Sequence, residues 1–74
     1  MNSIFEKSKL TPREYEVVRE LRKGYSNKVI ANAMGISDDT VKAHVTNIIR
    51  KMGVANRTQV AVSFTDEELS YLIN

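Results

Sequence analysis

The sequence predicts an all-α fold: a compact domain of four short helices, with a candidate short fifth helix at the C-terminus. Three observations predict it. Seventy-four residues, 42% of them hydrophobic, allow one small domain. Apolar residues recur at helical spacing along most of the chain. Capping residues and three glycines divide the chain into segments of helix length.

Composition excludes several classes of function. The chain has no cysteine and a single histidine, His44, so neither a disulfide nor a cysteine or histidine metal cluster is expected. Without a thiol, a spare histidine or a glycine-rich phosphate loop, the sequence predicts no enzyme, no catalytic site, no cofactor and no small-molecule ligand. No apolar run approaches the roughly 20 residues that span a bilayer, and the N-terminus lacks the apolar block of a secretory signal. We therefore expect a cytoplasmic protein without a membrane partner.

The first expected helix lies in LTPREYEVVREL. Its start combines a cap, a proline at the first helical position and the partner of a capping box: Thr11, Pro12 and Glu14. Leu10 and Tyr15 are placed for a hydrophobic staple. Helical spacing turns three apolar residues inward: Val17, Val18 and Leu21. Gly24 ends this helix.

The second expected helix lies in SNKVIANAM, with Ser26 as its cap. Its apolar face consists of three residues: Ile30, Ala31 and Met34. Gly35 ends the helix, because MGIS makes a tight turn in which this glycine takes a positive φ. Ser37 then caps the next helix.

The third expected helix, residues 38–52, has two unlike faces. One face is an apolar seam within a narrow arc: Val41, Val45, Ile48 and Met52. The opposite face carries small, hydrogen-bonding and basic residues: Asp39, Lys42, Ala43, Thr46, Asn47 and Arg50. Acids at the start and bases at the end complement the helix dipole, which is a sufficient structural reason for Arg50 and Lys51. Gly53 ends the helix.

Helix stability does not explain the middle of the polar face. Threonine and asparagine are mediocre helix formers, and a purely solvated face would favour Glu, Lys and Gln. Small and amide side chains beside bases suit a helix that lies in a DNA major groove, where bulk is limited and base edges offer donors and acceptors. Two short helices joined by a glycine-containing turn, the second with such a face, describe a helix-turn-helix.

The charge distribution favours the same interpretation. The net charge is only +2, but the segment from Arg22 to Arg57 contains seven bases and two acids, whereas other acids gather on either side of it. A basic middle framed by acidic ends indicates a surface that faces a polyanion. An ordinary mixture of solvated charges is the alternative.

Four residues are candidate base readers: Lys42, Ala43, Thr46 and Asn47. Lys42 can reach a guanine edge or a phosphate, and Asn47 can present its amide to adenine. Thr46 and Ala43 can contact a thymine methyl. Five residues are candidate phosphate contacts: Lys28, Ser37, Thr40, Arg50 and Arg57.

Each candidate also has a structural alternative. Lys42 and Arg50 could be simple surface charges, and Ala43 could serve only as a good helix former. Lys28 and Arg57 could be caps or ion-pair partners.

Beyond Gly53, ANRTQVAVSF begins a fourth helix with Asn56 as cap and Gln59 completing a capping box. Part of its apolar face should remain outward and bury against a second copy, which makes three residues candidate dimer contacts: Val60, Ala61 and Phe64. The alternative is that this face closes the monomer core. TDEELSYLIN then supplies a third capping box for a short helix that folds back, extends a dimer contact or docks a partner.

Four stretches, in this order and spacing, resemble the LuxR/FixJ-type (GerE-like) helix-turn-helix domain of bacterial transcription regulators: LTPREYEVV, GYSNKVIANAMGIS, TVKAHVTNIIRKMGV and NRTQVAV. The resemblance runs from Leu10 to about Val62. It implies a four-helix domain without a wing, whose third helix enters the major groove and whose fourth helix mediates dimerisation. It divides the chain into an N-terminal extension (1–9), the LuxR-type domain (10–64) and a C-terminal helical tail (65–74).

The resemblance can be carried over residue by residue. It matches three residues to base-facing positions: Lys42, Ala43 and Thr46. It matches three to positions near phosphates: Lys28, Thr40 and Arg57. Many members carry a larger apolar residue at the position of Ala43 and often a base at that of Thr46, so a shifted target preference is expected.

The sequence thus predicts a transcription regulator that binds a specific double-stranded DNA sequence as a homodimer through recognition helix 38–52. It is either a stand-alone factor, which Met1 and the residues before Leu10 favour, or the output domain of a larger regulator. From a different class, the alternative is a small helix-turn-helix interaction protein that modulates another regulator by heterodimerisation. A heterologous regulator and RNA polymerase are further candidate partners.

Overall fold

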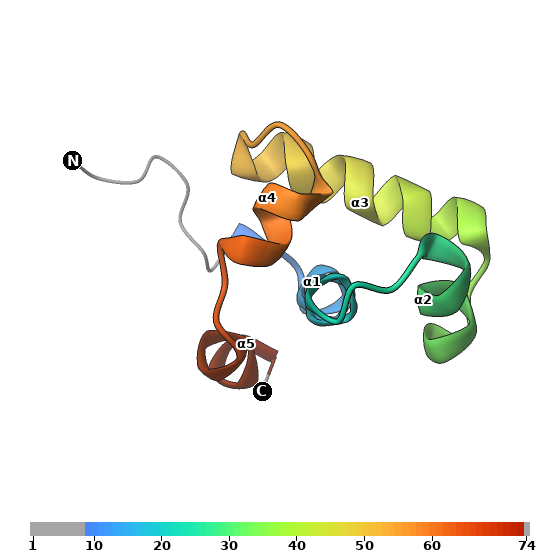
Figure 1. Cartoon of the computed structure of the whole chain (residues 1–74), viewed down its shortest axis with the longest axis horizontal. Helices are drawn as coiled ribbons and strands as arrows, with labels where there is room; N and C mark the ends of the chain where they lie inside the picture. Colours follow the sequence, from blue (N-terminus) through green and yellow to red (C-terminus); the bar gives the residue numbers. More distant parts are fainter. Residues whose placement is uncertain (1–8, 74) are drawn as a thin grey trace.

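The computed structural model describes residues 9–73 and forms five helices in this range (Figure 1). They are α1 (Pro12–Arg22), α2 (Asn27–Met34), α3 (Asp38–Met52), α4 (Arg57–Val62) and α5 (Asp66–Ile73). No strand occurs among residues 9–73, so the predicted all-α fold without a wing is confirmed. Nearly all of the expected N-terminal extension, 1–9, lies outside the described residues. In the described part, no helix combines the length and the apolar character needed to cross a membrane.

α1 is the central helix of the fold and contacts each of the other four. Figure 1 looks along α1, with α3 on one side of it, α5 on the opposite side, and α2 and α4 flanking it. Its predicted inward stripe is buried: Val17, Val18 and Leu21. A small chain has one modest core, and here α1 supplies the middle of it.

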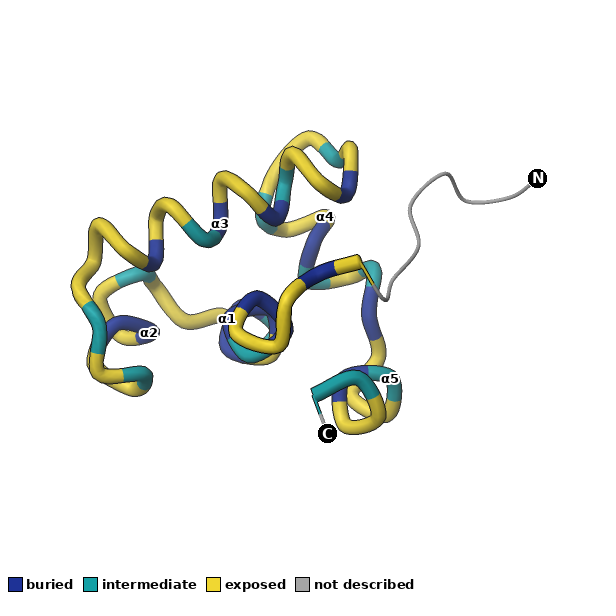
Figure 2. The backbone as a smooth tube through the Cα atoms, turned by 180° about the vertical axis from the view of Figure 1, so that it is seen from behind, coloured by how far each residue is buried: buried dark blue, intermediate teal, exposed yellow. Residues whose placement is uncertain are grey.

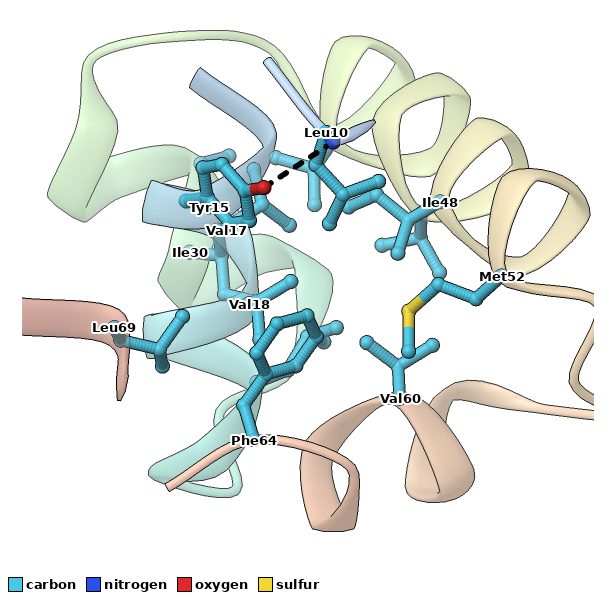
Figure 3. Packing of buried hydrophobic residues seen from close by; sticks show 14 residues of the cluster. Leu10, Tyr15, Val17, Val18, Ile30, Ile48, Met52, Val60, Phe64 and Leu69 are labelled. Atoms are coloured by element: carbon cyan, nitrogen blue, oxygen red, sulfur yellow. Dashed lines mark hydrogen bonds between the residues drawn. The ribbon is translucent and has the colours of Figure 1, made fainter. Parts of the chain in front are cut away.

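The start of α1 forms as its sequence predicts. The Glu14 N–H donates to the Thr11 hydroxyl at 3.1 Å, and the Thr11 N–H donates to the Glu14 carboxylate at 2.9 Å, which completes the capping box. Leu10 and Tyr15 are both buried, and the Leu10 N–H donates to the Tyr15 hydroxyl at 3.3 Å (Figure 3). The chain enters α1 in a direction that these local contacts fix.

The turn between α2 and α3 also follows its local signals. Ser26 and Ser37 cap the two helices through their side-chain oxygens. Gly35 ends α2 at φ 69°, and the Ile36 N–H donates to the Ala31 carbonyl at 3.0 Å. An added Cβ at Gly35 would meet no atom within 4 Å, so a glycine is favoured there by backbone conformation and not by lack of space.

The capping boxes of α4 and α5 differ. Thr65 and Glu68 form the expected reciprocal pair at 2.9 and 3.0 Å. At α4, Asn56 accepts from the Gln59 N–H at 2.9 Å, but the Gln59 side chain accepts from the N–H of Ala55 and not from that of Asn56. At α4, the bond from the glutamine side chain back to the backbone therefore lies one residue before the position expected for a capping box.

The expectation that part of the α4 apolar face points outward is wrong for two of its three residues. Val60 and Phe64 are 0% and 1% exposed, and Ala61 is partly buried. Phe64 points inward between Val60 and Leu69 (Figure 3). Its ring meets the Tyr15 ring edge-on, with centroids 6.2 Å apart and planes at 81°. For Val60 and Phe64 the alternative interpretation holds, since both side chains belong to the monomer core.

The fifth helix forms and folds back onto α1. Leu69 is 1% exposed and belongs to the common core. Arg22, near the end of α1, donates to the Asp66 carboxylate at 2.9 Å and to the Ala61 carbonyl at 2.8 Å, and it also donates to the carbonyl of Phe64. One guanidinium thus joins α1, the end of α4 and the start of α5.

Candidate nucleic-acid interface

The two faces of α3 are separated as predicted. The apolar seam is buried: Val41, Val45, Ile48 and Met52. Figure 2 shows the helix exposed along the side that faces away from α1. The four candidate base readers are all exposed: Lys42, Ala43, Thr46 and Asn47. The core therefore holds α3 by one face and presents the other face to an external partner.

Arg50 and Asn47 interact on this outer face. The Arg50 Nη2 donates to the Asn47 Oδ1 at 3.1 Å, and both residues are exposed. A candidate phosphate contact and a candidate base reader are thus joined before any ligand binds.

The start of α3 has both attractive and opposing features for a phosphate. The Ser37 hydroxyl accepts from the Thr40 N–H at 3.1 Å and lies 2.8 Å from the Thr40 hydroxyl, so the two side chains are paired with each other. Asp38 and Asp39 occupy the same first turn. Their carboxylates oppose a phosphate at this point, so the attraction must come largely from cations elsewhere on the surface.

Arg57 has a structural role. Its Nη1 donates to the Asn27 side-chain oxygen at 2.5 Å, and its Nη2 donates to the Tyr25 carbonyl at 2.9 Å. These bonds fasten the start of α4 to the start of α2, next to the exposed Lys28. The position of Lys28 suits a phosphate contact, whereas a phosphate would have to share Arg57 with this connection.

Sequence reasoning missed the partner of Glu14. The Glu14 residue as a whole is only 4% exposed, and its carboxylate accepts from the Lys51 ammonium at 2.9 and 3.1 Å. Burial raises the pKa of Glu14, but Lys51 and the Thr11 N–H and hydroxyl outweigh burial and hold this pKa below its usual value. The sequence does contain a signal for this pair: Glu14 falls on the same helical spacing as the buried residues of α1, and a buried carboxylate needs a cation beside it.

The neighbouring residue on α1 holds the other helix of the pair. Arg13 donates to the Met34 carbonyl at the end of α2 at 3.2 Å and to Glu16 at 2.8 Å. Arg13 therefore fastens the end of α2, and Glu14 fastens the end of α3. Two successive residues of α1 thus position both helices of the helix-turn-helix.

The described residues contain no group of three or more His, Cys, Asp or Glu side chains arranged to hold a metal ion. What the surface offers is an exposed helix face with amide, hydroxyl, methyl and ammonium groups. These are the groups that read base edges in a groove.

Comparison with known proteins agrees with this geometry. Residues 8–64 match the family of bacterial regulatory proteins of the luxR type. The chain is 43% identical over 60 residues to the nitrate/nitrite response regulator protein NarP of Escherichia coli, covering 81% of the chain and 28% of the relative. It is 53% identical over 53 residues to the transcriptional regulatory protein DegU of Brevibacillus brevis, covering 72% of the chain and 22% of the relative.

A third relative matches slightly more of the chain. The CsgBAC operon transcriptional regulatory protein of Escherichia coli is 47% identical over 64 residues, or 86% of the chain and 29% of the relative. The chain thus spans only about a quarter of the length of these relatives.

Proposed function

Because the chain belongs to the luxR family of bacterial regulatory proteins, we propose that it binds a specific double-stranded DNA sequence in the cytoplasm and so controls transcription. It is a DNA-binding regulatory domain and not an enzyme, as the sequence predicts. In the proposed complex, α3 lies in the major groove with its outer face toward the bases.

The observation that carries this proposal is the outer face of α3. Lys42, Thr46 and Asn47 are exposed on a helix whose other face is locked in the core. A recognition helix needs this combination, because base readers discriminate only if the helix that carries them is held firmly. Ala43 adds a small side chain that allows close approach to a thymine methyl.

Phosphate contacts would supply most of the affinity and set the register. Lys28 and Arg50 are exposed, and Arg50, which donates one hydrogen bond to Asn47, has further N–H groups that can reach a phosphate. Ser37 and Thr40 lie at the helix start, where hydroxyls can contact a phosphate oxygen. Each phosphate that a lysine or arginine side chain neutralises steepens the fall of log K of binding with log salt concentration by about 0.9.

We further propose that two copies bind together. One good base contact discriminates by about 1–3 kcal/mol, so the few readers of one α3 give modest specificity. Val60 and Phe64 are in the core, which leaves the outward side of α4 as the dimer surface. Val62 is 74% exposed there, with Ala61 partly exposed beside it. A second copy related by a two-fold axis would bury the two valines against each other.

Selection of the 74-residue chain on randomised duplex DNA at near-physiological salt tests the function. We expect a motif of two related half-sites separated by about one helical turn. A control variant with alanine at Lys42, Thr46 and Asn47 should lose the motif but keep weak binding at low salt, because its phosphate contacts remain. No motif from the wild-type chain would contradict specific DNA recognition and would favour the alternative, a module that binds another regulator. A single half-site would contradict the dimer.

Val62→Asp tests the dimer surface. Because Val62 is exposed, we expect the free energy of unfolding to change by less than about 0.5 kcal/mol. Repulsion between two carboxylates across the two-fold axis should weaken binding to paired half-sites about tenfold, while binding to one half-site is unchanged. Tyr71→Asp is the matched control, since Tyr71 is 84% exposed on α5. Affinities are measured by titration of both DNA duplexes. If Tyr71→Asp, and not Val62→Asp, weakened binding to paired half-sites, the dimer surface would lie on α5.

A further inference from the structure

α4 ends in a different way from the two helices before it. α2 and α3 each end at a glycine in the left-handed conformation, Gly35 and Gly53. A residue in this conformation turns the chain so that backbone N–H groups bond the last carbonyls of the helix. Gly53 is the last glycine of the chain, and the residue after α4, Ser63, is right-handed at φ −80°. The carbonyls at the end of α4 therefore need donors from elsewhere as well.

One of these donors comes from another helix. Ser63 donates to two of the last carbonyls, with its hydroxyl at 2.6 Å and its N–H at 3.1 Å: those of Gln59 and Val60. The Ala61 carbonyl accepts from Arg22 Nη1 at 2.8 Å, and the same nitrogen donates to the Phe64 carbonyl just beyond the helix. A charged donor makes a hydrogen bond roughly twice as strong as a neutral one. Arg22 of α1 thus caps the end of α4.

This cap matters because α4 is short. It has six residues, whereas isolated helices shorter than roughly 12–15 residues are marginal in water, so the rest of the chain must hold α4 in place. Val60 anchors it in the core, but its last residue, Val62, is mostly exposed and has little packing to hold it. The last turn therefore depends on the hydrogen bonds at its carbonyls.

Arg22 is itself oriented by α5. Its Nε donates at 2.9 Å to the carboxylate of Asp66, the first residue of α5. The Asp66 side chain is 88% exposed, so this ion pair contributes little to the stability of the fold. Its effect is one of direction: because a guanidinium is a rigid planar fork, a bond at Nε also fixes where the Nη1 N–H groups point.

We propose that Arg22 is a positioning residue for dimerisation: it caps α4 so that Val62 is held ready for a second copy, and Asp66 aims it. This inference rests on the proposed dimer. α5 follows the family match, which ends at residue 64, and it lies on the opposite side of α1 from α3 (Figure 1). This helix thus acts on the dimer surface through Arg22, away from the proposed DNA.

Arg22→Met is the first variant, because it keeps an aliphatic side chain and loses the N–H donors. A last turn that is formed about a third of the time in each copy leaves two copies competent about a tenth of the time, so binding to paired half-sites should weaken about tenfold. Binding to one half-site should stay unchanged, because α3 is held by its own buried seam. Arg22→Lys, which keeps the charge and can still donate to the carbonyls, should restore part of the paired affinity. Arg19→Met, at an exposed position of α1, is the control for the lost charge.

Asp66 supplies a milder variant that leaves the core untouched. Asp66→Ala should weaken binding to paired half-sites about two- to fivefold, the range of an exposed ion pair. Added to Arg22→Met, it should weaken binding no further, because Asp66 acts through Arg22. Glu67→Ala, at an exposed acid in the same turn of α5, is the matched control. Effects of Asp66→Ala and Arg22→Met that simply add would contradict this coupling.

Hydrogen exchange in the free protein tests the cap without DNA. Arg22→Met should speed exchange of the backbone amides at the end of α4, those of Ala61, Val62 and Ser63, far more than exchange of the buried α3 seam. Exchange that speeds by the same factor in both helices would mean a general loss of stability and would overturn the positioning role. Unchanged exchange at the end of α4 would overturn it as well.

The DNA titrations separate this inference from the proposed function. Wild-type affinity of Arg22→Met for paired half-sites would overturn the inference alone, and so would equal weakening on paired and single half-sites. A wild-type chain that selects only a single half-site would instead overturn the proposed dimer, and the role of Arg22 in dimerisation with it.

Discussion

Phe64→Ala is expected to lower the free energy of unfolding by about 3–5 kcal/mol, a large share of the stability of so small a domain. Phe64 is 1% exposed and is among the largest fully buried side chains. Truncating a buried phenylalanine costs about 3–5 kcal/mol, through lost apolar burial and the cavity that remains. A domain of this length has a total stability of only about 4–11 kcal/mol. The edge-on contact with Tyr15 is lost as well.

Urea unfolding followed by circular dichroism measures this effect. Phe64→Leu should lose about 1–2 kcal/mol, because it refills most of the volume. Val62→Ala, at an exposed position two residues earlier, should change stability by less than about 0.5 kcal/mol. A Phe64→Ala protein that folds normally but no longer dimerises would return Phe64 to the dimer surface and contradict its place in the core.

Features that depend on neighbouring residues could be predicted from the sequence. The Thr11 and Glu14 capping box, the glycine turn at Gly35 and the α3 seam are each set by residues within a few positions of one another. The exposure of the face opposite the seam followed from the same periodicity. Local geometry thus determined the helices and the candidate reading face.

Features that depend on distant residues could not be predicted in this way. Spacing places Val60 and Phe64 on one face of α4 but does not say whether another helix covers that face. Here α1 and α5 do. Arg57 likewise meets Asn27 across 30 residues, a contact that no local pattern encodes. The helix dipole already explained a lysine at position 51, so the sequence offered no cause to look for its distant partner, Glu14.

Lys51→Met is expected to lower the free energy of unfolding by about 1–3 kcal/mol at neutral pH. Removing one partner of a fully buried ion pair costs about 3–5 kcal/mol, and the value is smaller here because the Lys51 side chain is 32% exposed. The change leaves a Glu14 side chain that is only 6% exposed, and the Thr11 N–H still donates to its carboxylate at 2.9 Å. Lys23→Met is a control with a more exposed pair: the side chains of Lys23 and Glu20 are 48% and 11% exposed, against 32% and 6% for Lys51 and Glu14, so we expect a smaller loss of stability.

The pH dependence separates this pair from a general loss of packing. The Glu14 pKa is lowered in the folded chain, so its stabilisation is present in full above the ordinary glutamate pKa of about 4.3 and is lost as the pH falls through the folded value. Without Lys51 the folded pKa moves up, and acidification should cost the variant less stability than it costs the wild type. Equal acid losses in both proteins, measured by urea unfolding at neutral and acid pH, would contradict the pairing. Because Lys51 lies in the last turn of α3 and Glu14 in the first turn of α1, the same variant should also bind the proposed DNA site more weakly, since α3 would be held less firmly against the helix that positions it.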